Sequence, residues 1–174
     1  ADKMTIVSPS WKRDLEGIGA KNVSVLVWGY DEDDFKSLKV SLDEKLTLTH
    51  SGLLSHDRHP EVLFAAMAEL KQEIEDFSAI FSLQLIGQID TQVKENIKNY
   101  SIEDMTNIIL QVPRQKSLEY IASSQLTLLL LNQAENVMGR IPGKLFEYLA
   151  TKRPILCLGP QGSDVDNIIT EFTN

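Results

Sequence analysis

Residues 126–158 read LTLLLLNQAENVMGRIPGKLFEYLATKRPILCL. The apolar runs at 126–131 and 154–158 have the length and composition of buried strands. Pro142 fixes a backbone φ that suits the first turn of a helix, so the stretch after it is expected to be helical. A strand, a helix and a second strand in this order form the repeating unit of a parallel α/β sheet.

The same alternation recurs along the whole chain. Strands are expected near residues 4–8, 23–27, 46–51, 82–87, 106–111, 126–131 and 154–158. Helices are indicated between them, after Pro60, around Leu118 and after Ser163, where Asp166 completes a variant of the capping box. These repeats predict an α/β fold with a Rossmann-like parallel sheet and helices on both faces.

The chain has 174 residues, 43% of them hydrophobic, which suits one globular domain and a small addition. An acidic run at 31–34 opens a polar stretch that divides the sequence. We expect residues 1–35 to be the end of a preceding domain and a crossover, and residues 36–45 to be a linker. Residues 46–174 then form the Rossmann-like domain, truncated at its carboxyl end. A plain surface loop in place of the linker is the open alternative.

A formal charge of −8 gives nucleic acid no broad basic surface, although a few cations can still bind a small anion locally. No apolar run approaches the roughly 18 residues of a membrane span. The first residues are not those of a signal peptide, so the cytoplasm is the expected location. The single cysteine, Cys157, lies in an apolar run and is expected to be a buried small hydrophobe in a reducing compartment.

An anion site is indicated at the start of the helix after Pro142. Gly143 leaves its backbone N–H accessible, and the Lys144 ammonium adds positive charge where a helix end already attracts anions. Glu147 lies three residues later on the same side of the helix, where its carboxylate can accept two hydrogen bonds from a ribose diol. Diphosphate and ribose together are what a nucleotide presents. An ordinary Lys144–Glu147 ion pair is the alternative that the spacing leaves open.

A second loop follows the strand that ends near residue 50. Gly52 allows a ligand to approach the backbone closely, and Arg58 lies just before a helix, where it can clamp a phosphate. Without further context, a plain turn with a surface arginine is favoured there. A P-loop is disfavoured because Gly139 to Lys144 is one residue short of the G-x-x-x-x-G-K-[ST] spacing, and Leu145 replaces the hydroxyl.

Metal-dependent or covalent chemistry is not indicated. His56, Asp57 and His59 share one loop without a further ligand, which is a poor template for a metal site. The three histidines fall within ten residues and Cys157 lies mid-strand, so no Ser-His-Asp or Cys-His arrangement is supported. We assign neither a catalytic residue nor a metal site.

The string Ile141 to Ala150, with Arg153-Pro154 and residues 156–160 after it, closely resembles one segment of the family 4 retaining GT-B glycosyltransferases. In that family the segment is the donor-binding helix and the next strand. Weaker similarity extends to residues 5–10, 25–35, 49–52, 85–87 and 112–119. The resemblance covers nearly the whole chain but only the second half of such an enzyme. It implies the C-terminal, donor-binding half of a GT-B fold.

The resemblance implies a site for a nucleoside-diphosphate sugar, transferred with retention. In this reading Glu147 holds the ribose, Gly143 and Lys144 face the diphosphate, and Arg58 is a second phosphate contact. The residues that flank the base are Val112, Pro113 and Arg114. Because protein cations stabilise the departing diphosphate, neither a divalent cation nor another cofactor is expected.

The sequence departs from the family pattern at Gly139. The family often carries Glu-x7-Glu, and the first glutamate, which usually contacts the sugar, would stand at this position. The identity of the transferred sugar is therefore open. Subgroups that have the Pro-Gly-Lys-Leu string also lack this glutamate, so we treat the difference as variation.

Two other functions remain as alternatives: a GT-B sugar-nucleotide epimerase and a non-catalytic Rossmann-like binding module. As half of a transferase, the chain is expected to act with an acceptor-binding domain of the same protein. Alone it is expected to bind nucleotide weakly and catalyse nothing. Surface polysaccharide synthesis is the commonest setting for such enzymes, and peripheral membrane association of the intact enzyme stays open.

Overall fold

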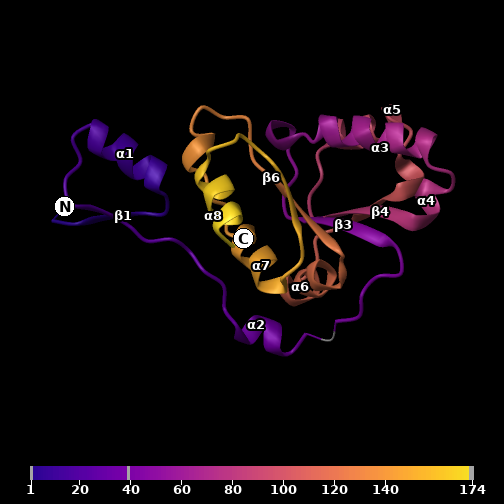
Figure 1. The fold of residues 1–174 in the computed structure, drawn as a ribbon, viewed down its shortest axis with the longest axis horizontal. Helices are drawn as coiled ribbons and strands as arrows, with labels where there is room; N and C mark the ends of the chain where they lie inside the picture. The colour runs from indigo at the N-terminus through magenta and orange to yellow at the C-terminus, as the bar shows by residue number, and fades with distance from the viewer. Residues whose placement is uncertain (1, 39, 173–174) are drawn as a thin grey trace.

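The computed structural model describes residues 2–38 and 40–172, which form two parallel sheets (Figure 1). The large sheet has the order β5-β4-β3-β6-β7, and the small sheet pairs β1 with β2. The strands are β1 (Met4–Ile6), β2 (Val23–Val25), β3 (Leu46–Ser51), β4 (Phe81–Ile86), β5 (Thr106–Ile109), β6 (Leu126–Leu130) and β7 (Ile155–Leu158). All seven predicted strands are confirmed, and every pair is parallel.

Helices cover both faces of the large sheet. Those on one face are α3 (Glu61–Glu73), α4 (Phe77–Ile80) and α5 (Thr91–Asn99), and those on the other are α6 (Arg114–Ser123), α7 (Lys144–Thr151) and α8 (Asp164–Phe172). Leu128 and Leu130 of β6 pack in the first hydrophobic cluster, whereas Leu129 and Leu131 pack in the second. Successive side chains of a strand point to opposite faces, so a strand buried on both sides must be apolar throughout. The predicted Rossmann-like architecture is confirmed.

The starts of α7 and α8 lie close to the expected positions. α7 begins at Lys144 rather than Pro142, because the Leu145 and Phe146 N–H groups bond carbonyls only three residues back. Ser163 caps α8 as predicted, with its Oγ 3.2 Å from the Asp166 backbone N–H that donates to it. The Asp166 carboxylate in turn accepts from the Gly162 N–H at 2.8 Å, one residue before the N–H that a standard capping box engages.

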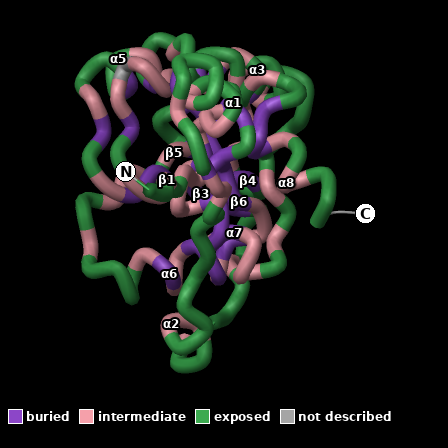
Figure 2. The backbone as a smooth tube through the Cα atoms, turned by 90° about the vertical axis from the view of Figure 1, so that its left-hand side faces the viewer, coloured by how far each residue is buried: buried purple, intermediate pink, exposed green. Residues whose placement is uncertain are grey.

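The segment between the two sheets lies along the outside of the α6–α7 layer. Its short helix α2 (Asp33–Lys36) lies below α6 in Figure 1. Figure 2 shows the backbone around α2 as mostly exposed. Phe35 and Leu38 nevertheless pack against the second cluster. Further along, the Asp43 N–H donates to the Ser123 carbonyl. The segment is therefore anchored at several points.

The small sheet and its helix α1 (Pro9–Gly17) dock on the large domain through polar contacts. The buried Asp164 carboxylate accepts hydrogen bonds from the backbone N–H and the hydroxyl of Ser10, both at 2.9 Å. Trp11 Nε1 donates to the Asn136 carbonyl at 3.0 Å. Charge-assisted bonds of this kind, made in a buried position, fix the orientation of α1.

Gly139 lies where α1 meets the short 3₁₀ helix η3 (Val137–Gly139). A Cβ at this position would lie 2.3 Å from Trp11 Cδ1 and 2.7 Å from Ser8 Oγ. The indole therefore occupies the space that a side chain at 139 would need. This packing gives a structural reason for glycine at the position of the first motif glutamate.

Two smaller features complete the description. Cys157 is partly buried in β7, and burial raises the pKa of its thiol to about 11, so it is protonated at neutral pH. Among the described residues, no helix combines the length with the apolar character that a bilayer crossing requires.

Gly139→Ala is expected to lower the free energy of unfolding by about 1–3 kcal/mol, because the added methyl overlaps the Trp11 ring. Gly17→Ala is the matched control, since nothing lies within 4 Å of a Cβ there. Urea unfolding measures both. The penalty should shrink when Trp11→Ala is added, and an equal stability of the two glycine variants would contradict the packing argument.

Candidate functional site

A pocket of about 450 Å³ lies at the carboxyl ends of β3, β4 and β5, beside α6 and α7. This edge is where parallel α/β sheets bind ligands. Four of the eight residues predicted from the sequence line the pocket: Gly52, Val112, Arg114 and Glu147. They come from four separate loops or helices, and the parallel topology brings them together.

Two glycine turns shape the floor of this pocket. Gly52 and Gly87 have φ values of +112° and +121°, a region that side chains disfavour. A Cβ on Gly87 would lie 2.8 Å from the Gly52 carbonyl oxygen, and one on Gly52 would lie 3.0 Å from Lys144 Nζ. Both positions therefore need glycine. The Lys144 ammonium lies over Gly52, where the sequence predicts the close approach of a ligand.

Lys144 reaches back from α7 to the buried His50 at the end of β3. Lys144 Nζ lies 3.4 Å from His50 Nε2, and His50 Nδ1 lies 3.0 Å from the Leu128 carbonyl oxygen. Because a carbonyl only accepts, Nδ1 must carry the proton, which leaves Nε2 as the acceptor for the ammonium. His50 thus positions Lys144.

Burial dominates the electrostatics of this contact. It lowers the pKa of His50 to about 3, with help from the Lys144 charge, so the imidazole is neutral. Burial, and then the Arg58 charge, lower the pKa of Lys144 to about 8, against an opposing influence from Glu147. An ammonium held this way lacks a strong anionic partner, which is the condition that favours binding an anion.

Glu147 pairs with Arg114 and not with Lys144. Glu147 Oε1 accepts from Arg114 Nη2 at 2.9 Å, and the Glu147 side chain is 24% exposed. The Lys144–Glu147 pair that the spacing left open is replaced by a contact between two helices. The carboxylate faces the pocket and not the apolar interior.

Tyr148 fixes the position of α7 relative to β3. Its ring is fully buried in the second cluster, and its hydroxyl accepts a hydrogen bond from the Ser51 backbone N–H at 3.0 Å. Burial raises the pKa of this phenol well above its ordinary value. The neighbouring Glu147 is thereby held at the pocket edge.

The start of α7 offers two backbone donors. No protein acceptor bonds the N–H groups of Gly143 and Lys144 within residues 2–38 and 40–172. Gly143 packs under Trp28, where a Cβ would lie 3.3 Å from the ring. Pro113, predicted with Val112 and Arg114 to flank the base, lies directly before α6.

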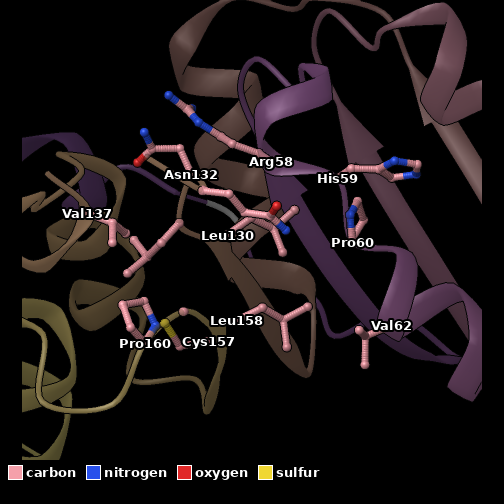
Figure 3. A pocket seen from close by; sticks show the side chains of 13 residues that line it. Arg58, His59, Pro60, Val62, Leu130, Asn132, Val137, Cys157, Leu158 and Pro160 are labelled. Atoms are coloured by element: carbon pink, nitrogen blue, oxygen red, sulfur yellow. The ribbon is translucent and has the colours of Figure 1, made fainter. Parts of the chain in front are cut away.

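Arg58 lies between β3 and α3 and lines two adjoining pockets of about 480 and 510 Å³. Asn132 lines both as well, and its buried Oδ1 has no partner among the described residues. Figure 3 shows the Arg58 and Asn132 side chains extending in the same direction, while the His59 ring points away from them. Arg58 is thus separated from the Gly52–Glu147 pocket but is close enough to lower the pKa of Lys144.

In the loop before α3, the His56 side chain lies outside the described part of the structure, and His59 is engaged by neighbouring side chains. His59 Nε2 lies 2.9 Å from the Asn96 amide nitrogen, and its ring packs against Phe64. In the described part of the chain, no three His, Cys, Asp or Glu side chains come together as ligands.

Sequence reasoning missed the roles of His50, Tyr148 and Asn132. His50 appeared only within the string 49–52, yet a histidine at the end of an otherwise apolar strand is a signal that it could have used. Tyr148 reads as an ordinary core residue of an amphipathic helix. Asn132 has no local signal, because only the fold shows that it is buried without a partner.

Comparison with known proteins defines the fold. Neither a protein-family model nor a curated protein sequence matches the chain. Similar solved structures include HepE, WaaG and sucrose-phosphate synthase. HepE from Anabaena, in complex with UDP and glucose, has a TM-score of 0.70 and 13% identity, over 98% of this chain and 53% of HepE. WaaG, a glycosyltransferase involved in lipopolysaccharide biosynthesis, has a TM-score of 0.75 and 13% identity, over 97% of this chain and 47% of WaaG.

Sucrose-phosphate synthase from Thermosynechococcus elongatus has a TM-score of 0.64 and 18% identity, over 98% of this chain and 49% of the synthase. The chain therefore spans about half the length of these three proteins. At such identities the likeness establishes the fold, which is that of about half of a GT-B glycosyltransferase.

The free energy of unfolding is expected to fall as the pH drops below about 6.5, by up to about 1.4 kcal/mol per pH unit from His50. Folded His50 stays neutral down to a pKa of about 3, whereas the unfolded residue takes up a proton near its ordinary pKa of 6.5. The contribution of the neutral His50 to the free energy of unfolding is therefore fully present above about pH 6.5 and is lost progressively as the pH falls below it. His50→Asn should remove this slope between pH 6.5 and 5 in urea unfolding, and His59→Asn is the control. Parallel curves for wild type and His50→Asn would refute the assignment.

Proposed function

We propose that this chain is the nucleotide-sugar-binding part of a glycosyltransferase that transfers a sugar with retention. The observation that carries the proposal is the start of α7. There, two backbone N–H groups that have no protein acceptor among the described residues, and the buried Lys144 ammonium, lie one turn before Glu147, whose carboxylate lines the pocket at the carboxyl ends of the strands. The GT-B fold and the UDP and glucose described for HepE support this reading.

Each part of a nucleotide finds a complementary group. The Glu147 carboxylate accepts hydrogen bonds from the ribose hydroxyls, and Val112, Pro113 and Arg114 flank the base. The N–H groups of Gly143 and Lys144, with the Lys144 ammonium, bind the diphosphate, and Arg58 is a second phosphate contact. Gly52 keeps the backbone close to the ligand.

The sugar is proposed to extend from the diphosphate toward the pockets that Arg58 and Asn132 line. The unpartnered Asn132 oxygen is an acceptor for a sugar hydroxyl. In the transfer step, the bond from the sugar C1 to the diphosphate oxygen breaks, an acceptor hydroxyl oxygen bonds C1 on the same face, and the hydroxyl proton passes to the departing diphosphate oxygen. Lys144 and Arg58 stabilise the negative charge that develops on the diphosphate, so we propose that no divalent cation is needed.

The acceptor side of the cleft is proposed to belong to another part of the same protein. Residues 1–35 are assigned to the end of that part and the crossover, 36–45 to the linker, and 46–174 to the donor domain. The chain alone is then expected to bind nucleotide without transferring sugar. A cytoplasmic role in surface polysaccharide synthesis is our proposed setting, by analogy with WaaG.

Glu147→Gln is expected to weaken UDP binding by about 10- to 100-fold, the size of a lost hydrogen bond to a charged group. Isothermal titration calorimetry with UDP and GDP measures it. Glu95→Gln, an exposed change on α5, is the control. Equal affinity of wild type and Glu147→Gln, or no nucleotide binding by a longer chain that includes the acceptor part, would contradict the proposal.

UDP affinity is expected to fall as the pH rises through about 8, because only the charged Lys144 attracts the diphosphate. The bound anion raises the Lys144 pKa, so binding at pH 8 should take up roughly half a proton. Calorimetry in buffers of different ionisation enthalpy measures this uptake. Lys144→Arg should bind UDP without proton uptake, and Lys94→Met should behave as wild type. Uptake that persists in Lys144→Arg would rule out Lys144 as the titrating group.

A further inference from the structure

Helix α2, in the segment that connects the two sheets, is linked to the nucleotide pocket through the Arg114 side chain. Arg114 Nη1 donates to Asp34 Oδ2, and Arg114 Nη2 donates to Glu147 Oε1 at 2.9 Å. One guanidinium therefore joins a carboxylate of the connecting segment to the carboxylate that we assign to the ribose. Asp34 belongs to none of the residues proposed above to contact the nucleotide.

Asp34 is held in place by neighbours on both sides of the contact. Gln115 Nε2 donates to the Asp34 carbonyl and to Ser37 Oγ, both at 3.2 Å. Phe35 packs on the second hydrophobic cluster, and its ring meets Tyr30 edge to face. The Asp34 side chain is 28% exposed, so it is more enclosed than an ordinary surface charge.

The adjacent Asp33 provides the contrast. It pairs with Lys36 within α2 at 2.7 Å, and its side chain is 81% exposed. It carries the same charge on the same short helix but does not contact Arg114 in the structure. A comparison of substitutions at the two aspartates thus distinguishes the effect of the contact with Arg114 from the effect of local negative charge.

Arg114 donates one Nη group to Asp34 and the other to Glu147, and this arrangement determines what Glu147 can bind. A guanidinium with both Nη groups free pairs with a carboxylate through two parallel bonds, which is the preferred geometry. Here Asp34 engages one Nη group, and Glu147 receives the other through Oε1 alone. In the described part of the chain, Glu147 Oε2 accepts no bond from protein, so it stays open for a hydroxyl.

Asp34 and Glu147 both act on the charge of Arg114. Both carboxylates raise the pKa of Arg114, and the Asp34 hydrogen bond is the larger cause. Removing Asp34 would leave Glu147 as the remaining carboxylate partner of the guanidinium. The guanidinium would then turn both donors to Glu147 and cover the oxygen that a ribose needs.

We propose that Asp34 is a positioning residue of the nucleotide site, which holds Arg114 so that one oxygen of Glu147 remains available to the ribose. The inference rests on the proposed function and adds to it a role for the segment that connects the two sheets. Nucleotide binding and the docking of α2 are then linked, and by reciprocity each stabilises the other.

The test compares Asp34→Asn with Asp33→Asn. Asp34→Asn is expected to weaken both UDP and uridine by about 3- to 10-fold, the range for a partly exposed charge contact, whereas Asp33→Asn leaves both unchanged. Calorimetry measures UDP, and NMR shift titration measures the weaker uridine. Uridine carries no phosphate, so an equal loss for both ligands locates the effect at the nucleoside and not at the diphosphate.

Two further variants distinguish positioning from a general structural role. In an Arg114→Met background, Asp34→Asn should have no added effect, because its only route to Glu147 is gone. Asp34→Glu, which keeps the carboxylate, should recover part of the affinity. Urea unfolding should give equal stabilities for Asp34→Asn and Asp33→Asn.

The possible results distinguish the positioning role of Asp34 from the proposed nucleotide-binding function. If the wild-type chain binds UDP but Asp34→Asn matches Asp33→Asn, or binds UDP more tightly than wild type, the positioning role is overturned and the proposed function stands. A loss for UDP without a loss for uridine also overturns it, because the effect would then be phosphate electrostatics. If the wild-type protein, in the longer chain that includes the acceptor part, binds neither UDP nor GDP, both proposals fail.

Discussion

The candidate site depends on a neutral imidazole enclosed between a backbone carbonyl and an ammonium. His50 is fully buried, donates from Nδ1 to Leu128 and presents Nε2 to Lys144. Because a charged imidazole would be strongly disfavoured there, the ring stays neutral and can act as an acceptor. The arrangement connects β3, β6 and α7 at one point and holds the lysine beside Gly52.

The geometry of α7 explains why one helix can serve both the core and the pocket. Leu145 and Tyr148 are fully buried against the sheet, and the Tyr148 hydroxyl bonds the end of β3. Helical spacing then places Lys144 and Glu147 one turn apart on the neighbouring side. The hydrophobic positions thus orient the polar ones, and core packing pre-organises the groups assigned to a ligand.

Segments distant in sequence complete the surroundings of this helix. The Asp164 carboxylate accepts hydrogen bonds from Ser10 at the start of α1, and Trp11 fills the space beside Gly139. The loop before α7 is therefore packed against residues from outside the large sheet. On the other side, Asp34 engages Arg114. The polypeptide outside the Rossmann-like part therefore contacts the loop before α7 on one side and, on the other, the arginine that pairs with Glu147 of α7.

The amino-acid sequence alone determined the strand–helix alternation, all seven strands and the residue types that stand at the start of α7. It could do so because burial on both faces of a parallel sheet requires apolar runs, and because helix ends favour particular residue types. The tertiary structure alone decided that Glu147 pairs with Arg114, 33 residues earlier, and that Lys144 contacts His50, 94 residues earlier. It also placed Arg58 in a neighbouring pocket and Trp11 in the space beside Gly139. Periodicity records which side of an element is buried, but side-chain partners across such separations are set by how the elements pack.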